Sequence, residues 1–86
     1  MNRCSWKERY LLSLSEEMTA NEIMQLRNVN KKEALAIRKE AISYCKKNNI
    51  KMVGQKVPTE AVLKVTGKEI EYYYQKMVLE AKAKEN

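Results

Sequence analysis

The chain contains no histidine and no aspartate, and only two cysteines. Without histidine it has no Ser-His or Cys-His catalytic pair, and two thiols alone cannot complete a structural zinc site, which needs four nitrogen or sulfur ligands. It also lacks a glycine-rich phosphate loop and a cluster of aspartates. We therefore expect no catalytic residues, no metal site and no cofactor, and we predict that the protein is not an enzyme.

The two thiols are Cys4 and Cys45. A reducing cytosol disfavours a disulfide between them. We interpret Cys45 as an apolar residue in the core of a helix and Cys4 as incidental.

Long apolar segments are also missing. No apolar run approaches 18 residues, so the sequence predicts no membrane span. The segment Met1–Glu8 has one early positive charge but no apolar region after it. We therefore expect no signal peptide and an intracellular location.

Glycine and proline are scarce, with two and one respectively among 86 residues. Alanine, leucine, glutamate, lysine, glutamine and methionine are plentiful, and these residues favour helices. The length is that of one domain, which we expect to span residues 1–86. The composition therefore predicts a single, mainly α domain.

The positive charge is concentrated in one segment. Residues 31–56 contain eight basic residues and only two acidic ones, Glu33 and Glu40, which accounts for the whole net charge of +6. The eight are Lys31, Lys32, Arg38, Lys39, Lys46, Lys47, Lys51 and Lys56. Such confinement indicates a surface that binds a polyanion, and DNA is the first candidate.

Capping patterns predict three helices in the first half of the chain. Ser5-x-x-Glu8 begins one over residues 6–17, although the alternation at residues 12–15 leaves an extended conformation open there. Thr19-x-x-Glu22 begins a short helix over 20–27. After a turn at residues 28–30, Asn30 caps a long helix over 31–48, which the Asn48-Asn49 pair ends in a left-handed cap.

Steps of 100° per residue divide the long helix into two faces. The inward stripe contains Ala34, Ile37, Ala41 and Cys45, flanked by Leu35, Ile42 and Tyr44. The outward face contains Lys32, Ala36, Lys39, Ser43, Lys46 and Lys47. Arg38 falls on the apolar side, where we expect it to snorkel or to find a partner.

The second half predicts a hairpin and two further helices. Residues 50–53 alternate like a strand, Gly54-Gln55 turn the chain, and Lys56-Val57 return it. Pro58 then suits the first position of a helix over 58–65. Thr66-x-x-Glu69 resembles a third capping box, which predicts a last helix over 67–84.

Two apolar sides are predicted on the last helix. Its main stripe contains Ile70, Tyr73, Tyr74, Met77 and Ala81, so we assign Tyr73 and Tyr74 to the core rather than to base stacking. Tyr72, Leu79 and Ala83 lie opposite, either as a dimer contact or as an ordinary exposed trio.

The order of helix, turn, longer helix, hairpin and helix is that of a winged helix-turn-helix with extra helices at both ends. In such folds the second helix of the pair enters the major groove. The basic face suits phosphates, the small Ala36 would allow close approach to a base edge, and Gln55 and Lys56 would lie at the tip of the wing. Asn28 and Asn30 at the mouth of the helix would bond a phosphate or base edge, or serve only as turn and cap residues. The candidate DNA-binding residues are Asn28, Asn30, Lys31, Lys32, Ala36, Lys39, Ser43, Lys46, Gln55 and Lys56.

The segment from Thr19 to Gly67 resembles small excisionase-like winged helix-turn-helix proteins of phages and integrative conjugative elements of Gram-positive bacteria. The resemblance rests on residues 19–26, the basic helix through Lys47 and the run from Ile50 to Leu63 with its Lys-Val-Pro sequence. It covers a little over half of the chain. The helix containing Trp6 and the long last helix depart from the usual small members.

The resemblance implies a protein that binds double-stranded DNA near the end of a mobile element, often in several copies, bends it and directs an integrase towards excision. Some relatives are repressors or transcription regulators. It further implies a location in the cytoplasm of a bacterial cell or phage-infected host, an integrase or other recombinase as a second partner, and a homodimer or cooperative assembly on DNA.

Two alternatives stay open. Because the last helix has two apolar sides, the protein would also suit a protein-interaction module, such as a phage-type adaptor or inhibitor, without nucleic-acid contact. RNA or single-stranded DNA is a weaker alternative target for the basic segment.

Overall fold

A computed structural model of the chain describes residues 4–52 and 54–84. These residues are mainly helical, as predicted, and form five helices and one two-stranded antiparallel sheet. In chain order the elements are α1 (Trp6–Ser13), β1 (Glu17–Met18), α2 (Ala20–Arg27), α3 (Lys31–Lys47), β2 (Val57–Pro58), α4 (Thr59–Thr66) and α5 (Ile70–Lys84).

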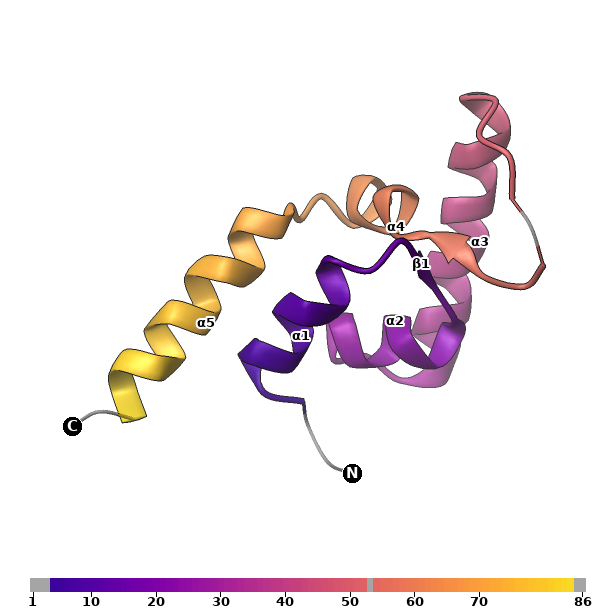
Figure 1. Ribbon diagram of the computed structural model, residues 1–86. Coiled ribbons are helices and arrows are strands. Elements are labelled where there is room, and N and C mark those ends of the chain that lie inside the picture. Colours follow the sequence, from indigo (N-terminus) through magenta and orange to yellow (C-terminus); the bar gives the residue numbers. More distant parts are fainter. Residues whose placement is uncertain (1–3, 53, 85–86) are drawn as a thin grey trace.

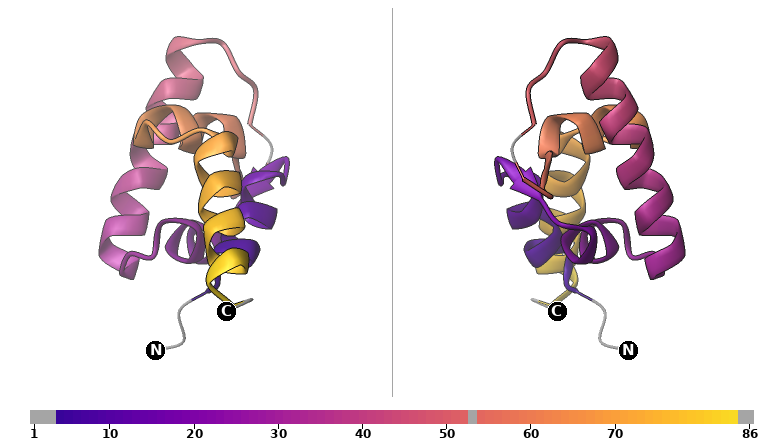
Figure 2. Two further views of the ribbon diagram at one scale, coloured as in Figure 1. Left: turned by 90° about the vertical axis from the view of Figure 1, so that its left-hand side faces the viewer. Right: turned by 90° about the vertical axis from the view of Figure 1, so that its right-hand side faces the viewer.

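The molecule is elongated, with principal extents of 47 × 26 × 19 Å. The two longest helices, α3 and α5, stand at opposite ends, with α1, α2 and α4 between them (Figure 1). Helix α3 packs against α2 and α4, while α5 packs mainly on α1. The two side views show the end of α3 reaching past the other helices (Figure 2). The basic helix is therefore separated from the C-terminal helix by the body of the protein.

The sheet differs from the predicted hairpin. Strand β2 pairs with β1, so that Met18 lies opposite Val57 and Glu17 opposite Pro58. Ile50–Met52 form no strand, and Val53 lies outside the described residues. The predicted pairing with 56–57 is therefore wrong for the described residues 50–52, although the chain does turn at Gly54-Gln55, where Gly54 has a φ of 74° that favours glycine.

Burial explains the observed pairing. Met18 and Val57 are both fully buried, and the pairing places these two side chains together in the core. The backbone N–H of Thr59 also donates to the carbonyl oxygen of Glu16 at 3.0 Å, and the Ser15 and Thr59 hydroxyls lie 3.0 Å apart. Alternation along 50–53 indicated a strand but contained no information about its partner.

Local capping explains where the first three helices begin. Ser5 with Glu8 and Thr19 with Glu22 form reciprocal capping boxes, and Asn30 Oδ1 accepts from the backbone N–H of Glu33 at 2.8 Å. These predicted starts are confirmed. The first helix is shorter than predicted, because it ends at Ser13 and the chain is extended at Glu17, so only the alternative for residues 12–15 anticipated a break.

Asparagines in left-handed conformations end the next two helices. Asn28 follows α2 with φ 55° and ψ 50°, and Asn49 lies two residues after α3 with φ 55°. The predicted left-handed asparagine after the long helix is therefore confirmed, with Asn49 in that role.

The two C-terminal helices begin later than predicted. Pro58 precedes α4 as its N-cap, so the first helical residue is Thr59 and not Pro58. Thr66 does not cap α5: it is the last residue of α4, and its hydroxyl donates to the Val62 carbonyl oxygen at 2.8 Å. Gly67 ends α4 with φ 71°, and α5 begins only at Ile70. The left-handed glycine interrupts the helix that the third capping pattern predicted.

The core lies largely in the middle of the chain. Among the described residues the fully buried apolar side chains are Met18, Ile23, Leu26, Ala34, Ala41, Cys45, Val57, Ala61, Val62 and Tyr73. All but Tyr73 belong to the segment from β1 to α4. Helix α5 contributes Tyr73, whose hydroxyl accepts a hydrogen bond from Arg27 Nη1 at 3.1 Å.

Helix α1 and helix α5 meet through aromatic rings. Trp6 lies edge-on to Tyr72, with ring centroids 5.9 Å apart, and Tyr10 lies edge-on to Tyr74 at 5.5 Å. The guanidinium of Arg9 lies 3.8 Å from the centre of the Trp6 ring. The prediction that Tyr72 faces away with Leu79 and Ala83 is therefore wrong, because Tyr72 packs against α1.

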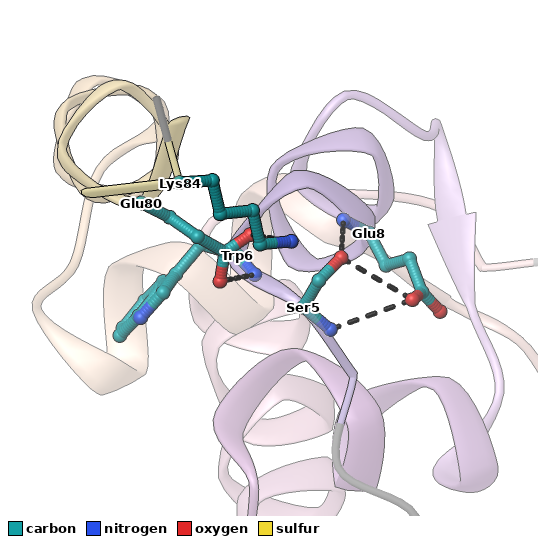
Figure 3. A network of polar contacts seen from close by, with 5 residues as sticks. All are labelled: Ser5, Trp6, Glu8, Glu80 and Lys84. Atoms are coloured by element: carbon teal, nitrogen blue, oxygen red, sulfur yellow. Dashed lines mark hydrogen bonds and ion pairs between the residues drawn. The ribbon is translucent and has the colours of Figure 1, made fainter. Parts of the chain in front are cut away.

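Polar contacts join the start of α1 to the C-terminal part of α5. The backbone N–H of Trp6 donates to Glu80 Oε2 at 3.1 Å, and Lys84 Nζ lies 3.9 Å from the other carboxylate oxygen (Figure 3). The carboxylate of Glu80 thus satisfies an otherwise free N–H in the first turn of α1.

The predicted inward stripe of α5 is wrong in part, since Ile70 and Tyr74 are 40% and 47% exposed and Ala81 is also exposed.

Candidate nucleic-acid interface

Helix α3 has one face in the core. Ala34, Ala41 and Cys45 are buried, and Ile37 is half-buried beside them. This confirms the predicted inward stripe. Burial of small side chains at these positions brings α3 close to α2 and α4 and leaves its opposite face to solvent.

The opposite face is basic and open. All of its predicted members are exposed: Lys32, Ala36, Lys39, Ser43, Lys46 and Lys47. Within residues 4–52 and 54–84 the one salt bridge joins Lys84 to Glu80 on α5, so these lysines have no carboxylate within 4.0 Å in that part of the chain. Their charges therefore act on the solvent side of the helix.

Arg38 joins α3 to the loop before β2. Its side chain is half-buried, and Nε and Nη2 donate to the carbonyl oxygen of Gln55 at 3.3 and 2.9 Å. This agrees with the expectation that Arg38 finds a partner away from the outer face. The contact places the turn at Gly54-Gln55 beside α3, although the residues described on either side of it form no hairpin.

Three of the predicted site residues lie at the N-terminal end of α3. Asn28, Asn30 and Lys31 are all exposed. Asn30 Oδ1 is engaged by the Glu33 N–H, so its cap role is confirmed and its oxygen is occupied. The backbone N–H of Asn28 donates to the carbonyl oxygen of Met24, and the left-handed conformation of Asn28 forms the turn between α2 and α3. Both asparagines thus have structural roles, while their exposure leaves them open to solvent.

The remaining predicted residues lie on the loop. Gln55 and Lys56 are exposed, as is Lys51 earlier in the same loop. Since the Gln55 carbonyl is held by Arg38, the turn that contains Gln55 and leads into Lys56 lies next to the basic helix. The fold therefore places the predicted site residues on α3, at its N-terminal mouth and on one flanking loop.

Sequence reasoning missed Leu35. It was assigned to the flank of the inward stripe, but its side chain is 47% exposed and it adjoins Ala36 on the open side of α3. At 100° per residue it lies about 60° from Lys32, so its position on the helical wheel already indicated the outward face. It was assigned to the inward side only because leucine is apolar. An exposed leucine among lysines offers an apolar contact, such as one with a thymine methyl.

Neither thiol belongs to a site. Cys4 and Cys45 are both free, and Cys45 is 1% exposed. Burial raises the pKa of the Cys45 thiol, and the charge of Glu60 raises it further. Across the part of the chain that the structure describes, no three His, Cys, Asp or Glu side chains are grouped to hold a metal ion.

No helix in the described segments has the length and apolar character needed to cross a membrane. Comparison of the chain with models of protein families, with curated proteins and with solved structures gave no match.

Proposed function

We propose that this protein is a sequence-specific double-stranded DNA-binding protein of the winged helix-turn-helix type. In this proposal α3 enters the major groove, and the loop before β2 contacts the backbone or the minor groove as the wing. The observation that carries the proposal is the exposed face of α3, where Lys32, Lys39 and Lys46 surround the small side chains of Ala36 and Ser43.

The geometry of α2 and α3 supports this role. They are joined by the three residues Asn28–Asn30 and pack against each other, as the two helices of a helix-turn-helix do. Helix α3 is about 26 Å long at 1.5 Å per residue, and the major groove, about 12 Å wide, admits such a helix. Lysines would contact phosphates, while Ala36, Ser43 and Leu35 would face base edges.

The loop supports the wing assignment by position rather than by secondary structure. Arg38 holds the Gln55 carbonyl beside α3, and Lys51 and Lys56 on the loop are exposed. A basic loop held beside the reading helix would extend the contact to phosphates outside the major groove.

The biological role we propose is that of an excisionase-like architectural factor or a transcription regulator of a mobile element. The resemblance of residues 19–67 to excisionase-like proteins supports it, and it implies an integrase or recombinase as a second partner. A protein of this kind performs no chemistry and acts by binding and bending DNA.

The test is the salt dependence of binding to duplex DNA. Log K should fall linearly with log salt, with a slope of about −0.9 for each phosphate contact. Replacing Lys32, Lys39 and Lys46 by glutamine should flatten this slope by about 2 to 3 and weaken binding across all sequences.

A matched control is the replacement of Lys7, Lys82 and Lys84, which are exposed on α1 and α5, by glutamine. It removes the same charge and should leave the slope nearly unchanged. If both triple variants lose the same affinity, or if binding does not depend on salt, α3 is not the reading helix. Tighter binding to single-stranded DNA or RNA than to the duplex would reassign the nucleic-acid target.

A further inference from the structure

A groove of about 600 Å³ lies on the side of α4 away from α3. It is formed where the end of α1, the start of α4 and the start of α5 meet. Its lining includes the apolar side chains of Leu14, Leu63 and Ile70. Leu14 and Ile70 are 49% and 40% exposed, so the groove offers apolar surface to solvent.

The rim of this groove is acidic in a protein that is basic overall. Four of its lining residues are glutamates, and all four are exposed: Glu16, Glu60, Glu69 and Glu71. Lys64 is the one basic residue that lines it in the part of the chain that the structure describes. The groove thus has a local charge opposite to the net +6 of the chain.

The apolar surface extends beyond the groove along α5. Tyr74, one turn after Ile70, is 47% exposed and packs its ring edge-on against Tyr10 of α1. Leu14, Ile70 and Tyr74 therefore form an exposed apolar strip along the seam between α1 and α5. Contiguous apolar surface rimmed by charge is typical of a protein-binding site.

We propose that this groove docks a basic amphipathic segment of a partner protein. An apolar side chain of that segment lies between Leu14, Leu63 and Ile70, and its lysines or arginines face the four glutamates. Charge complementarity selects this occupant, because the rim repels nucleic acid and acidic peptides. This binding site goes beyond the proposed function and does not depend on it.

The position of the groove allows both surfaces to act together. On α4, Leu63 and Lys64 line the groove, whereas Val65 lies beside Ser43 and Lys47 of α3. Figure 1 shows α3 at one end of the molecule and the start of α5 on the other side of α4. DNA held on the basic face of α3 would therefore leave the groove open to a protein segment.

The test uses a synthetic amphipathic helical peptide of about 18 residues built from leucine and lysine, titrated into the ¹⁵N-labelled full chain. Amide shifts are expected at residues 14–16, 59–64 and 69–71, with the outward face of α3 unshifted. The double variant Glu60→Gln/Glu69→Gln should bind the peptide with about fivefold lower affinity, since each exposed charge pair contributes little to the binding free energy. The matched variant Glu33→Gln/Glu40→Gln, on α3, should bind the peptide like the wild type.

Three results would overturn the proposal. The first is equal affinity of the peptide for both double variants, and the second is equal binding of a leucine–glutamate peptide of the same length. The third is a concentration-dependent dimer, observed by sedimentation, that dissociates in the Glu60→Gln/Glu69→Gln variant. This result would assign the groove to a second copy of this chain. The triple variant of Lys32, Lys39 and Lys46 should bind the peptide with wild-type affinity, whether or not that variant still binds DNA.

Discussion

The guanidinium of Arg38 donates two hydrogen bonds to the carbonyl oxygen of Gln55, across 17 residues of chain. One end of this contact lies on α3 and the other at the turn of the loop before β2. It holds the loop in place without a β-ladder, since the observed strand partner of β2 is β1.

Arg38→Met tests this anchor. The substitution keeps an apolar stem and removes both donors, so the backbone of residues 54–56 should become more mobile. The free energy of unfolding should fall by about 0.5–1.5 kcal/mol, and affinity for duplex DNA should fall as the loop loses its position. Backbone ¹⁵N relaxation by NMR, urea unfolding and duplex titration measure these effects.

Arg38→Lys separates the anchor from the charge, because lysine keeps the charge but has no planar pair of donors. It should raise the backbone mobility of residues 54–56 as Arg38→Met does. Wild-type mobility of this loop in both variants would show that the loop is held by other contacts.

Tyr73 is fully buried, and its hydroxyl accepts from Arg27 Nη1. Among the described residues Arg27 Nε is buried with no hydrogen-bond partner, so the guanidinium relies on the bond from Nη1 to the Tyr73 hydroxyl. Tyr73→Phe should lower the free energy of unfolding by about 1–3 kcal/mol, because it leaves a charged donor without its acceptor. Urea unfolding measures the change.

A double-mutant cycle tests the coupling. The double variant Arg27→Met/Tyr73→Phe should lose less unfolding free energy than the sum of the losses in the two single variants, because it removes donor and acceptor together. Tyr74→Phe, on the exposed side of α5, is the matched control and should change stability by less than about 0.5 kcal/mol. Strict additivity of Arg27→Met and Tyr73→Phe would argue against the pair.

Two threonines that look alike in sequence have different roles. Thr19 caps α2 in a reciprocal pair with Glu22, whereas Thr66 donates to Val62 within the last turn of α4. Thr19→Ala should therefore lower the free energy of unfolding by about 1 kcal/mol. Thr66→Ala should cost well under this, because such a bond within a helix is slightly destabilising or neutral. Equal losses in thermal unfolding would contradict the assignment.

The buried thiol of Cys45 predicts a pH dependence. Its pKa is raised in the folded state, chiefly by burial, so the folded protein keeps this proton to higher pH than the unfolded chain. The resulting stability is complete below the unfolded pKa of about 8.5 and is lost as pH rises through the folded pKa. The free energy of unfolding should thus decline more steeply above about pH 8.5 in the wild type than in Cys45→Ala. Parallel curves for the two proteins would refute this prediction.

Short-range chemistry made the first helices predictable. The starts of α1, α2 and α3 follow from side chains that bond a backbone N–H three residues ahead, and both partners are visible in the sequence. The faces of α3 were also largely predictable, because its inward stripe is apolar and its outward face is mostly lysine, although Leu35 was assigned to the wrong side. The same rule failed at Thr66, where a left-handed Gly67 ended one helix before the pattern could begin another.

Long-range packing decided the features that were mispredicted. The helical wheel of α5 has two apolar sides, and only contact with Trp6 of α1 determines that Tyr72 packs while Ile70 and Tyr74 remain exposed. The strip along Leu14, Ile70 and Tyr74, which belongs to two helices far apart in sequence, therefore could not be read from either helix.

The sequence by itself determined the helical character of this protein, the starts of its first three helices and the basic face of α3, because these depend on residues within one or two turns of each other. Only the tertiary structure decided that β2 pairs with β1, that Arg38 anchors the loop and that four glutamates share one groove. Each of these depends on which distant surfaces bury one another, and a local pattern contains no information about its partner.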